Sequence, residues 1–160
     1  MPTIEIKTLI KADLKTCFNL ARNIDFHKTS MEHSNEKAIA GKTSGLIELG
    51  EWVTWEAKHF GIEQKLTSKI TEFESPNYFV DEMISGAFKS FRHEHIFKNS
   101  FDNKFNVDYT LMIDKFHFQS PFGIFGKLAN VLFLKRYMTN LLETRNALLR
   151  QKAEEFCEIP

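Results

Sequence analysis

The chain has 160 residues, with 21 basic and 21 acidic side chains and therefore no formal net charge. This length predicts one domain, residues 1–160, large enough to bury an extensive core without cross-links. The neutral balance excludes the long-range positive field with which a protein tracks nucleic acid or anionic lipid, so we expect no nucleic-acid partner.

The N-terminal segment and the two cysteines bear on the location of the protein. Residues 1–7 alternate apolar and charged side chains, unlike the uninterrupted apolar core of a signal peptide. Cys17 and Cys157 lie near opposite ends of the chain and form no spaced metal motif, which is typical of free thiols in a reducing compartment. We therefore expect a cytoplasmic protein without a disulfide framework.

The first elements in chain order are a strand and one or two short helices. Residues Thr3–Ile10 alternate in hydropathy, which predicts a strand. Apolar residues then recur three and four apart over Leu14–Ala21, and Asp13 precedes them, so a short helix with Asp13 as its N-cap is predicted. Residues 25–37 are polar and fit either a second short helix or an irregular crossover.

A series of strands follows, each bounded by turn residues. The predicted strands cover residues 52–60, 61–73, 78–84, 88–98 and 104–118. The dipeptide Asp102-Asn103 is the strongest turn signal, because both residues tolerate the left-handed conformations that hairpins require. The connections are too short for parallel crossovers, so the strands are predicted to form an antiparallel meander.

The last element is one long helix that begins after residue 123 and ends near Phe156. Its leucines and Met138 are spaced to form an apolar stripe. Most of the charged residues of its second half are expected to face water; these are Glu143, Arg145, Arg150, Lys152, Glu154 and Glu155. We predict an α+β fold in which a curved antiparallel sheet of six or seven strands wraps around this C-terminal helix.

Four short motifs carry a resemblance to a known family. They are Trp-Glu-Ala-Lys-His-Phe-Gly at residues 55–61, the segment 79–88, His-Glu-His-Ile-Phe at 93–97, and Ser-Pro-Phe-Gly at 120–123. The chain resembles the START-like (SRPBCC) helix-grip superfamily of birch-pollen-allergen proteins, lipid-transfer START domains and polyketide cyclases. Within it, the motifs resemble a bacterial subgroup that occurs alone or fused to epimerase-like proteins called cell-division inhibitors. The resemblance implies a single START-like domain with a cavity for lipids, polyketides or other apolar molecules.

The segment 91–97 is the most informative strand. At a period of two, Phe91, His93, His95 and Phe97 share one face, which is predicted to point into the space that the sheet encloses. Three interpretations stay open: core histidines hydrogen-bonded to neighbouring strands or water, polar contacts to a ligand, and an acid/base or metal site.

A metal site at this strand would need a third ligand. His93 and His95 present two nitrogens on one face, as zinc sites require, but Glu94 points the other way. His59 is the leading candidate for the third ligand, although two strands of the meander would lie between it and the pair. We therefore predict no metal site and no cofactor.

The orientation of Asp81 depends on the turn near residues 85–87. A two-residue turn would pair Val80 with Phe91 and direct Asp81 outward, whereas a three-residue turn would pair Asp81 with Phe91 and set it diagonal to His93. An inward Asp81 would form either a polar anchor or acid/base dyad with the histidine, or a buried hydrogen bond that sets the register.

Other segments add candidate ligand contacts. On the last strand Tyr109, Leu111 and their alternate neighbours share a face that is predicted to point inward, where the Tyr109 hydroxyl could orient a ligand. Residues 116–134 are apolar on nearly every side, which fits closure of one end of the cavity, a homodimer interface or membrane contact. The predicted ligand-binding residues are Trp55, His59, Asp81, Phe91, His93, His95, Tyr109, Leu111, Leu132 and Met138.

The leading hypothesis is a carrier or sensor that binds one apolar small molecule between the sheet and the C-terminal helix. The alternative is an enzyme of cyclase, dehydratase or hydrolase type with His93 or His95 as general acid/base, although no catalytic residue is assigned. A protein or membrane interaction module is the third hypothesis. The sequence contains no nucleophile-elbow serine and no phosphate-binding glycine pattern.

Overall fold

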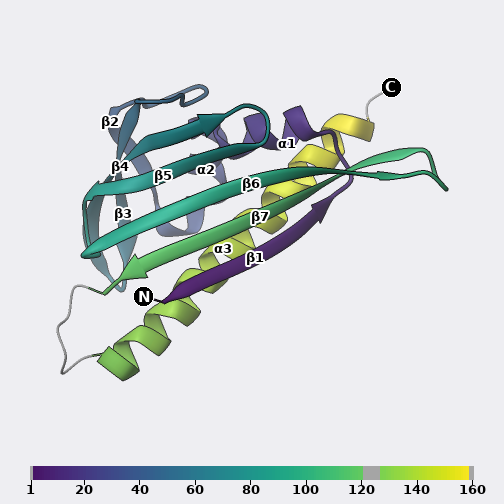
Figure 1. Cartoon of the computed structure of the whole chain (residues 1–160). Helices are drawn as coiled ribbons and strands as arrows, with labels where there is room; N and C mark the ends of the chain where they lie inside the picture. The colour runs from purple at the N-terminus through teal and green to yellow at the C-terminus, as the bar shows by residue number, and fades with distance from the viewer. Residues whose placement is uncertain (1, 121–126, 159–160) are drawn as a thin grey trace.

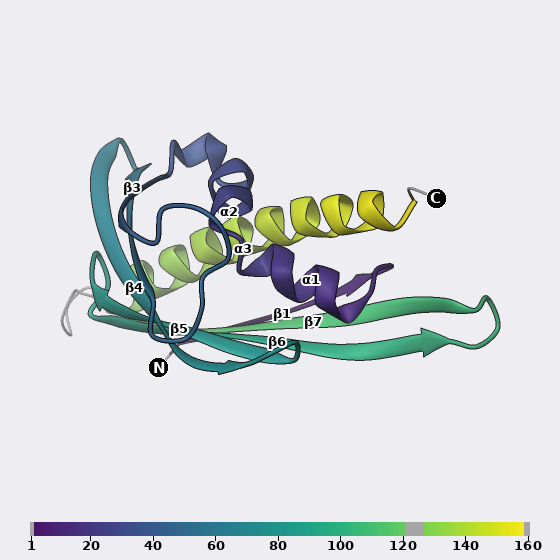
Figure 2. The ribbon, with the colours of Figure 1, turned by 90° about the horizontal axis from the view of Figure 1, so that it is seen from above.

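The computed structural model describes residues 2–120 and 127–158, and within 127–130 only the backbone. One antiparallel sheet curves around the long helix α3 (Lys127–Glu158), as Figures 1 and 2 show. The strand order is β1-β7-β6-β5-β4-β3-β2. The strands are β1 (Thr3–Ile10), β2 (Lys37–Gly41), β3 (Trp52–His59), β4 (Ile62–Glu74), β5 (Tyr78–Ser85), β6 (Ser90–Asp102) and β7 (Val107–Gln119). The predicted helix-grip α+β architecture is confirmed, with seven strands in the described part of the chain.

The short helices lie between the first two strands: α1 (Leu14–Ala21), α2 (Ile24–Ser30) and the single 3₁₀ turn η1 (Glu32–Ser34). Asp13 caps α1 as predicted, because its carboxylate accepts hydrogen bonds from the Thr16 amide at 2.9 Å and the Thr16 hydroxyl at 2.6 Å. Asn23 caps α2 in the same way through the Phe26 amide. These caps turn the chain twice and place both helices beside α3 (Figure 2).

The hairpin between β6 and β7 forms at the predicted turn, but β6 continues to Asp102, beyond its predicted end at residue 98. Asp102 is the last residue of β6, pairs with Val107, and accepts a hydrogen bond from the Lys104 amide at 2.9 Å. Asn106 adopts the left-handed conformation, with φ of 52°. The two strands extend well beyond the rest of the sheet (Figure 1).

The predicted inward face of β7 is wrong. Thr110, Met112, Asp114, Phe116 and Phe118 are buried, so the even-numbered positions face the interior. Tyr109 and Leu111 therefore lie on the opposite face of the sheet, where both are half-buried. Because β7 has apolar residues on both faces, alternation within the strand could not decide which face is inward.

Two apolar clusters form the core. Phe18 of α1 is the centre of the first, and its ring packs edge-on against Phe73, Phe79 and Phe97 at centroid distances of 5.4–5.5 Å. The second contains Phe91, Phe116 and Phe118 of the sheet and Leu142 of α3. Both clusters contribute residues to the lining of one cavity.

Candidate functional site

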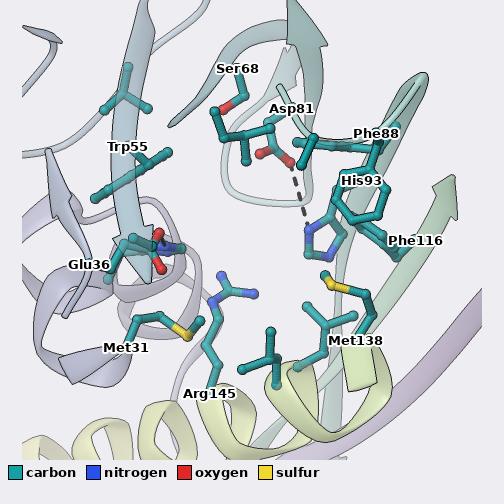
Figure 3. Close-up of a pocket in the computed structure, with 18 of the residues that line it drawn as sticks. Met31, Glu36, Trp55, Ser68, Asp81, Phe88, His93, Phe116, Met138 and Arg145 are labelled. Atoms are coloured by element: carbon teal, nitrogen blue, oxygen red, sulfur yellow. Dashed lines mark hydrogen bonds and ion pairs between the residues drawn. The ribbon is translucent and has the colours of Figure 1, made fainter. Parts of the chain in front are cut away.

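A cavity of about 460 Å³ lies between the sheet and α3 (Figure 3). This volume falls within the range of small-molecule sites, about 300–1,000 Å³. Its lining comes from α1, α2, strands β3 to β7 and α3, and is mainly aliphatic and aromatic. Apolar lining residues include Met31, Val53, Trp55, Ile70, Phe79, Phe91, Phe116, Met138, Leu141 and Leu142.

Most of the residues predicted to contact a ligand line this cavity: Trp55, His59, Asp81, Phe91, His93, His95 and Met138. Tyr109 and Leu111 do not, because of the face they occupy on β7. Leu132 lies on α3 with 63% of its surface exposed, so its predicted place in the cavity is wrong as well. Within the predicted apolar stretch 116–134, residues Phe122, Ile124 and Phe125 and the side chain of Leu128 lie outside the described part of the chain.

Asp81 faces the cavity through a register that neither predicted turn produces. Residues 86–89 connect β5 to β6, and Asp81 pairs directly with His93 while Phe79 pairs with His95. Within the connection, Phe88 packs edge-on against Phe116 and Phe118 at centroid distances of 6.1 and 5.7 Å. The partly buried Phe88 ring thus packs on the sheet from within a connection that is wider than a tight turn.

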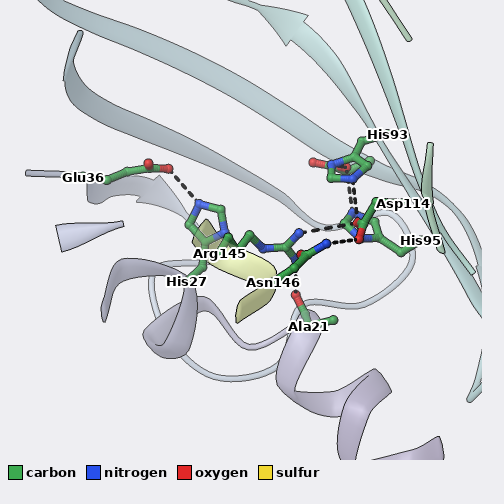
Figure 4. Close-up of polar contacts among 9 residues, drawn as sticks. Ala21, His27, Glu36, His93, His95, Asp114, Arg145 and Asn146 are labelled. Carbon is green, nitrogen blue, oxygen red and sulfur yellow. Dashed lines mark hydrogen bonds and ion pairs between the residues drawn. The ribbon is translucent and has the colours of Figure 1, made fainter. Parts of the chain in front are cut away.

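Asp114 of β7 is the centre of a buried polar cluster (Figure 4). Its carboxylate is fully buried and accepts hydrogen bonds from His93 Nε2 at 2.8 Å and from Asn146 Nδ2 at 2.7 Å. His95 Nδ1 lies 3.1 Å from Asp114 Oδ1, but off the hydrogen-bond axis. Arg145 Nη1 is 3.6 Å from the same oxygen. We call Asp114, His93, His95, Arg145 and Asn146 the Asp114 cluster.

Burial and the neighbouring charges shift the pKa values of His93 and His95 in opposite directions. Burial, aided by the neighbouring His95, lowers the pKa of His93 to about 4. Burial acts on His95 in the same direction, but Asp114 and Asp81 outweigh it and raise its pKa. Burial opposes ionisation of Asp114, yet its contacts with His93 and His95 hold its pKa well below the ordinary value. The cluster therefore favours the neutral form of His93 and the ionised form of Asp114, and it makes His95 easier to protonate than His93.

Arg145 and Asn146 are functional candidates that the sequence analysis missed. Both are buried, although Arg145 was expected to face water with most of the charged residues of its helix. They share the buried stripe of α3 with Leu142 and Leu149, at offsets of three to four residues. Their position within that stripe was the available signal, and Asp114 on β7 supplies the partner that makes their burial favourable.

A second polar group lies across the cavity from the Asp114 cluster. Glu36 accepts a hydrogen bond from His27 Nε2 at 2.8 Å, and the His27 ring packs on Trp55 at a centroid distance of 4.3 Å. Burial raises the pKa of Glu36, but His27, His59 and Arg145 together outweigh burial and lower it overall. His59 Nδ1 is 2.6 Å from the Tyr137 hydroxyl of α3. The apolar cavity is therefore bounded by polar groups on opposite sides.

The chain was compared with protein-family models, with curated proteins and with solved structures. No protein-family model matches the chain. No curated protein matches it either. Within the described part of the chain, no helix has both the length and the apolar character needed to cross a bilayer.

Solved structures do resemble this one. TTHA0849 from Thermus thermophilus superposes with a TM-score of 0.69 at 15% identity, over 92% of this chain and 97% of that one. A Nitrosospira multiformis protein gives a TM-score of 0.62 at 10% identity, over 95% and 96%. Ara h 8.0201, a helix-grip protein of the Bet v 1 type, gives 0.57 at 10% identity, over 92% and 97%. These likenesses show that the chain has a helix-grip fold.

Proposed function

We propose that this protein binds one apolar small molecule with an anionic or hydrogen-bond-accepting group, in the cavity between the sheet and α3. We also propose that the protein belongs to the bacterial START-like subgroup that its motifs resemble, and that its ligand is a lipid or a polyketide. The observation that carries it is Arg145, whose Nη1 atom is buried at an apolar cavity: Asp114 Oδ1 lies 3.6 Å away, and no residue in the described part of the chain gives Nη1 a hydrogen-bond partner.

The polar groups support an oriented ligand. Arg145 Nη2 donates to the Ala21 carbonyl at 3.3 Å, which holds the guanidinium at the cavity wall (Figures 3 and 4). A buried donor without a partner costs about 1–3 kcal/mol, and a carboxylate or carbonyl oxygen of a ligand would remove that cost. The aromatic and aliphatic lining would then bury the apolar part of the same molecule.

The test combines native mass spectrometry with a cavity-filling variant. Freshly purified protein is expected to carry a small molecule, and emptied protein to bind a fluorescent apolar probe. Ala57 faces the cavity beside Trp55, so Ala57→Phe should abolish probe binding. Ala147→Phe, on the exposed face of α3, is the matched control and should bind as the wild type does. Protein that emerges empty and binds no probe would overturn the proposal.

The enzyme alternative rests on His95, which lines the cavity between two carboxylates and has a raised pKa. Such a group could donate a proton to a bound substrate. His95→Gln distinguishes the two functions, because a carrier should keep binding its ligand with altered affinity, whereas an enzyme should lose turnover with binding retained.

A further inference from the structure

Three side chains of metal-binding type lie close together at the cavity wall, on strands β5 and β6: Asp81, His93 and His95. Asp81 Oδ1 lies 3.4 Å from His95 Nε2 and 3.7 Å from His93 Nδ1, and one ligand atom from each residue lies within 4.8 Å of the other two. In a tetrahedral zinc site with bonds of about 2.1 Å, neighbouring ligand atoms are about 3.4 Å apart. We infer that these three residues form a binding site for one divalent transition-metal ion such as Zn²⁺.

The orientation of the two rings supports a cation at this position. His93 Nε2 and His95 Nδ1 both face Asp114, so the opposite nitrogen of each ring faces Asp81. A neutral imidazole that donates to Asp114 presents a lone pair from its other nitrogen. His93 Nδ1 presents such a lone pair, whereas His95 Nε2 contacts Asp81 Oδ1 at 3.4 Å through a proton that the ion would displace. With that proton released, the two nitrogens and the carboxylate oxygen are all acceptors, and a cation among them satisfies all three.

Asp114 would act as a positioning residue that orients the two imidazoles of this site. Metal-ligating histidines usually donate their second ring N–H to a carboxylate, which orients the ring. Asp114 is fully buried and is held in turn by Asn146 and Arg145. It contacts both imidazoles and would make no bond to the ion.

The chemistry of the ligands indicates the class of ion and what else it binds. Imidazole nitrogens favour zinc and other transition metals over Mg²⁺ and Ca²⁺. Three protein ligands leave at least one position open, and all three residues line the cavity. The open position would hold water or an anionic oxygen of a cavity ligand. Metal binding is nevertheless independent of the proposed apolar ligand and is tested without it.

The test titrates chelator-treated protein with Co²⁺ and then Zn²⁺, in a Cys157→Ser background because the Cys157 thiol is exposed. One equivalent of Co²⁺ should produce the visible absorption of a tetrahedral site, and Zn²⁺ should displace it. Asp81→Asn and His95→Gln should abolish the spectrum. Asp114→Asn should weaken binding by about 10–100-fold. His59→Gln, in the same cavity but outside the three residues, is the matched control and should bind normally.

Two results would overturn the inference: no stoichiometric Co²⁺ or Zn²⁺ binding to the unsubstituted site, or variants of Asp81 and His95 that bind as the control does. Circular dichroism of each variant separates loss of a ligand from loss of the fold. Asp81 is the least buried of the three residues, so Asp81→Asn is the variant expected to fold normally. Probe binding by the same samples reports on the proposed function separately.

Discussion

Replacement of Asp114 by asparagine tests whether the Asp114 cluster stabilises the fold. The aspartate accepts a donor on each oxygen, from His93 on Oδ1 and from Asn146 on Oδ2. The substituted side chain has one oxygen and one NH₂ group, so one of these donors would face another donor. Rotation of the Asn146 amide can relieve that conflict, because Asn146 Oδ1 has no hydrogen-bond partner among the described residues. The loss of negative charge beside Arg145 cannot be relieved in this way.

The expected cost follows from that charge. Removal of one partner of a buried ion pair destabilises a protein by about 3–5 kcal/mol. Because the Asn146 amide can rotate, we expect the lower end, about 3 kcal/mol, out of a total stability of about 5–15 kcal/mol. For a domain of this size the midpoint of thermal unfolding should fall by about 6–12 °C.

The assay is urea unfolding followed by circular dichroism. Asp108→Asn, the same substitution at an exposed site on the same strand, is the matched control and should change stability by less than about 0.5 kcal/mol. Arg145→Met combined with Asp114→Asn should cost less than the sum of the two single variants, by about 1 kcal/mol or more. A cost below about 1 kcal/mol for Asp114→Asn alone would refute the proposed role of the charge.

Three further predictions concern α1 and the cysteines. Burial raises the pKa of Cys17 to about 11, so a thiol reagent at pH 8 should modify exposed Cys157 and reach Cys17 only after unfolding, as mass spectrometry will report. Phe18→Ala removes three edge-on aromatic contacts and should cost about 3–5 kcal/mol in urea unfolding. Asp13→Ala removes the cap of α1 and should cost about 1 kcal/mol.

Each of these has a control and a contradicting outcome. Equal labelling of both cysteines in the native protein would contradict the burial of Cys17. The exposed Phe105→Ala should change stability little, and an equal loss at Phe18 and Phe105 would contradict the core assignment. Asp13→Asn retains an acceptor and should keep most of the capping energy, so a loss equal to that of Asp13→Ala would exclude capping as the cause.

The sequence by itself was enough to determine most of the elements and the fold class, although it left α2 open and did not locate β2. Alternation over Thr3–Ile10, the Asp13 cap and the turn at Asp102-Asn103 are local signals, and each element formed where they indicated. The inward position of His93 and His95 followed from the period of one strand. Such properties depend on residues close together in the chain, so the pattern of one segment contains them.

Only the tertiary structure decided which side chains meet. The four-residue connection 86–89, whose Phe88 ring packs on Phe116 and Phe118, accompanies the register that brings Asp81 opposite His93. Strand β7 is apolar on both faces, and packing against α3 selected the face that carries Asp114. Arg145 is buried because that carboxylate, 31 residues earlier in the chain, lies beside it. Burial of a charge depends on a partner from another element, and no pattern within one helix or strand contains that partner.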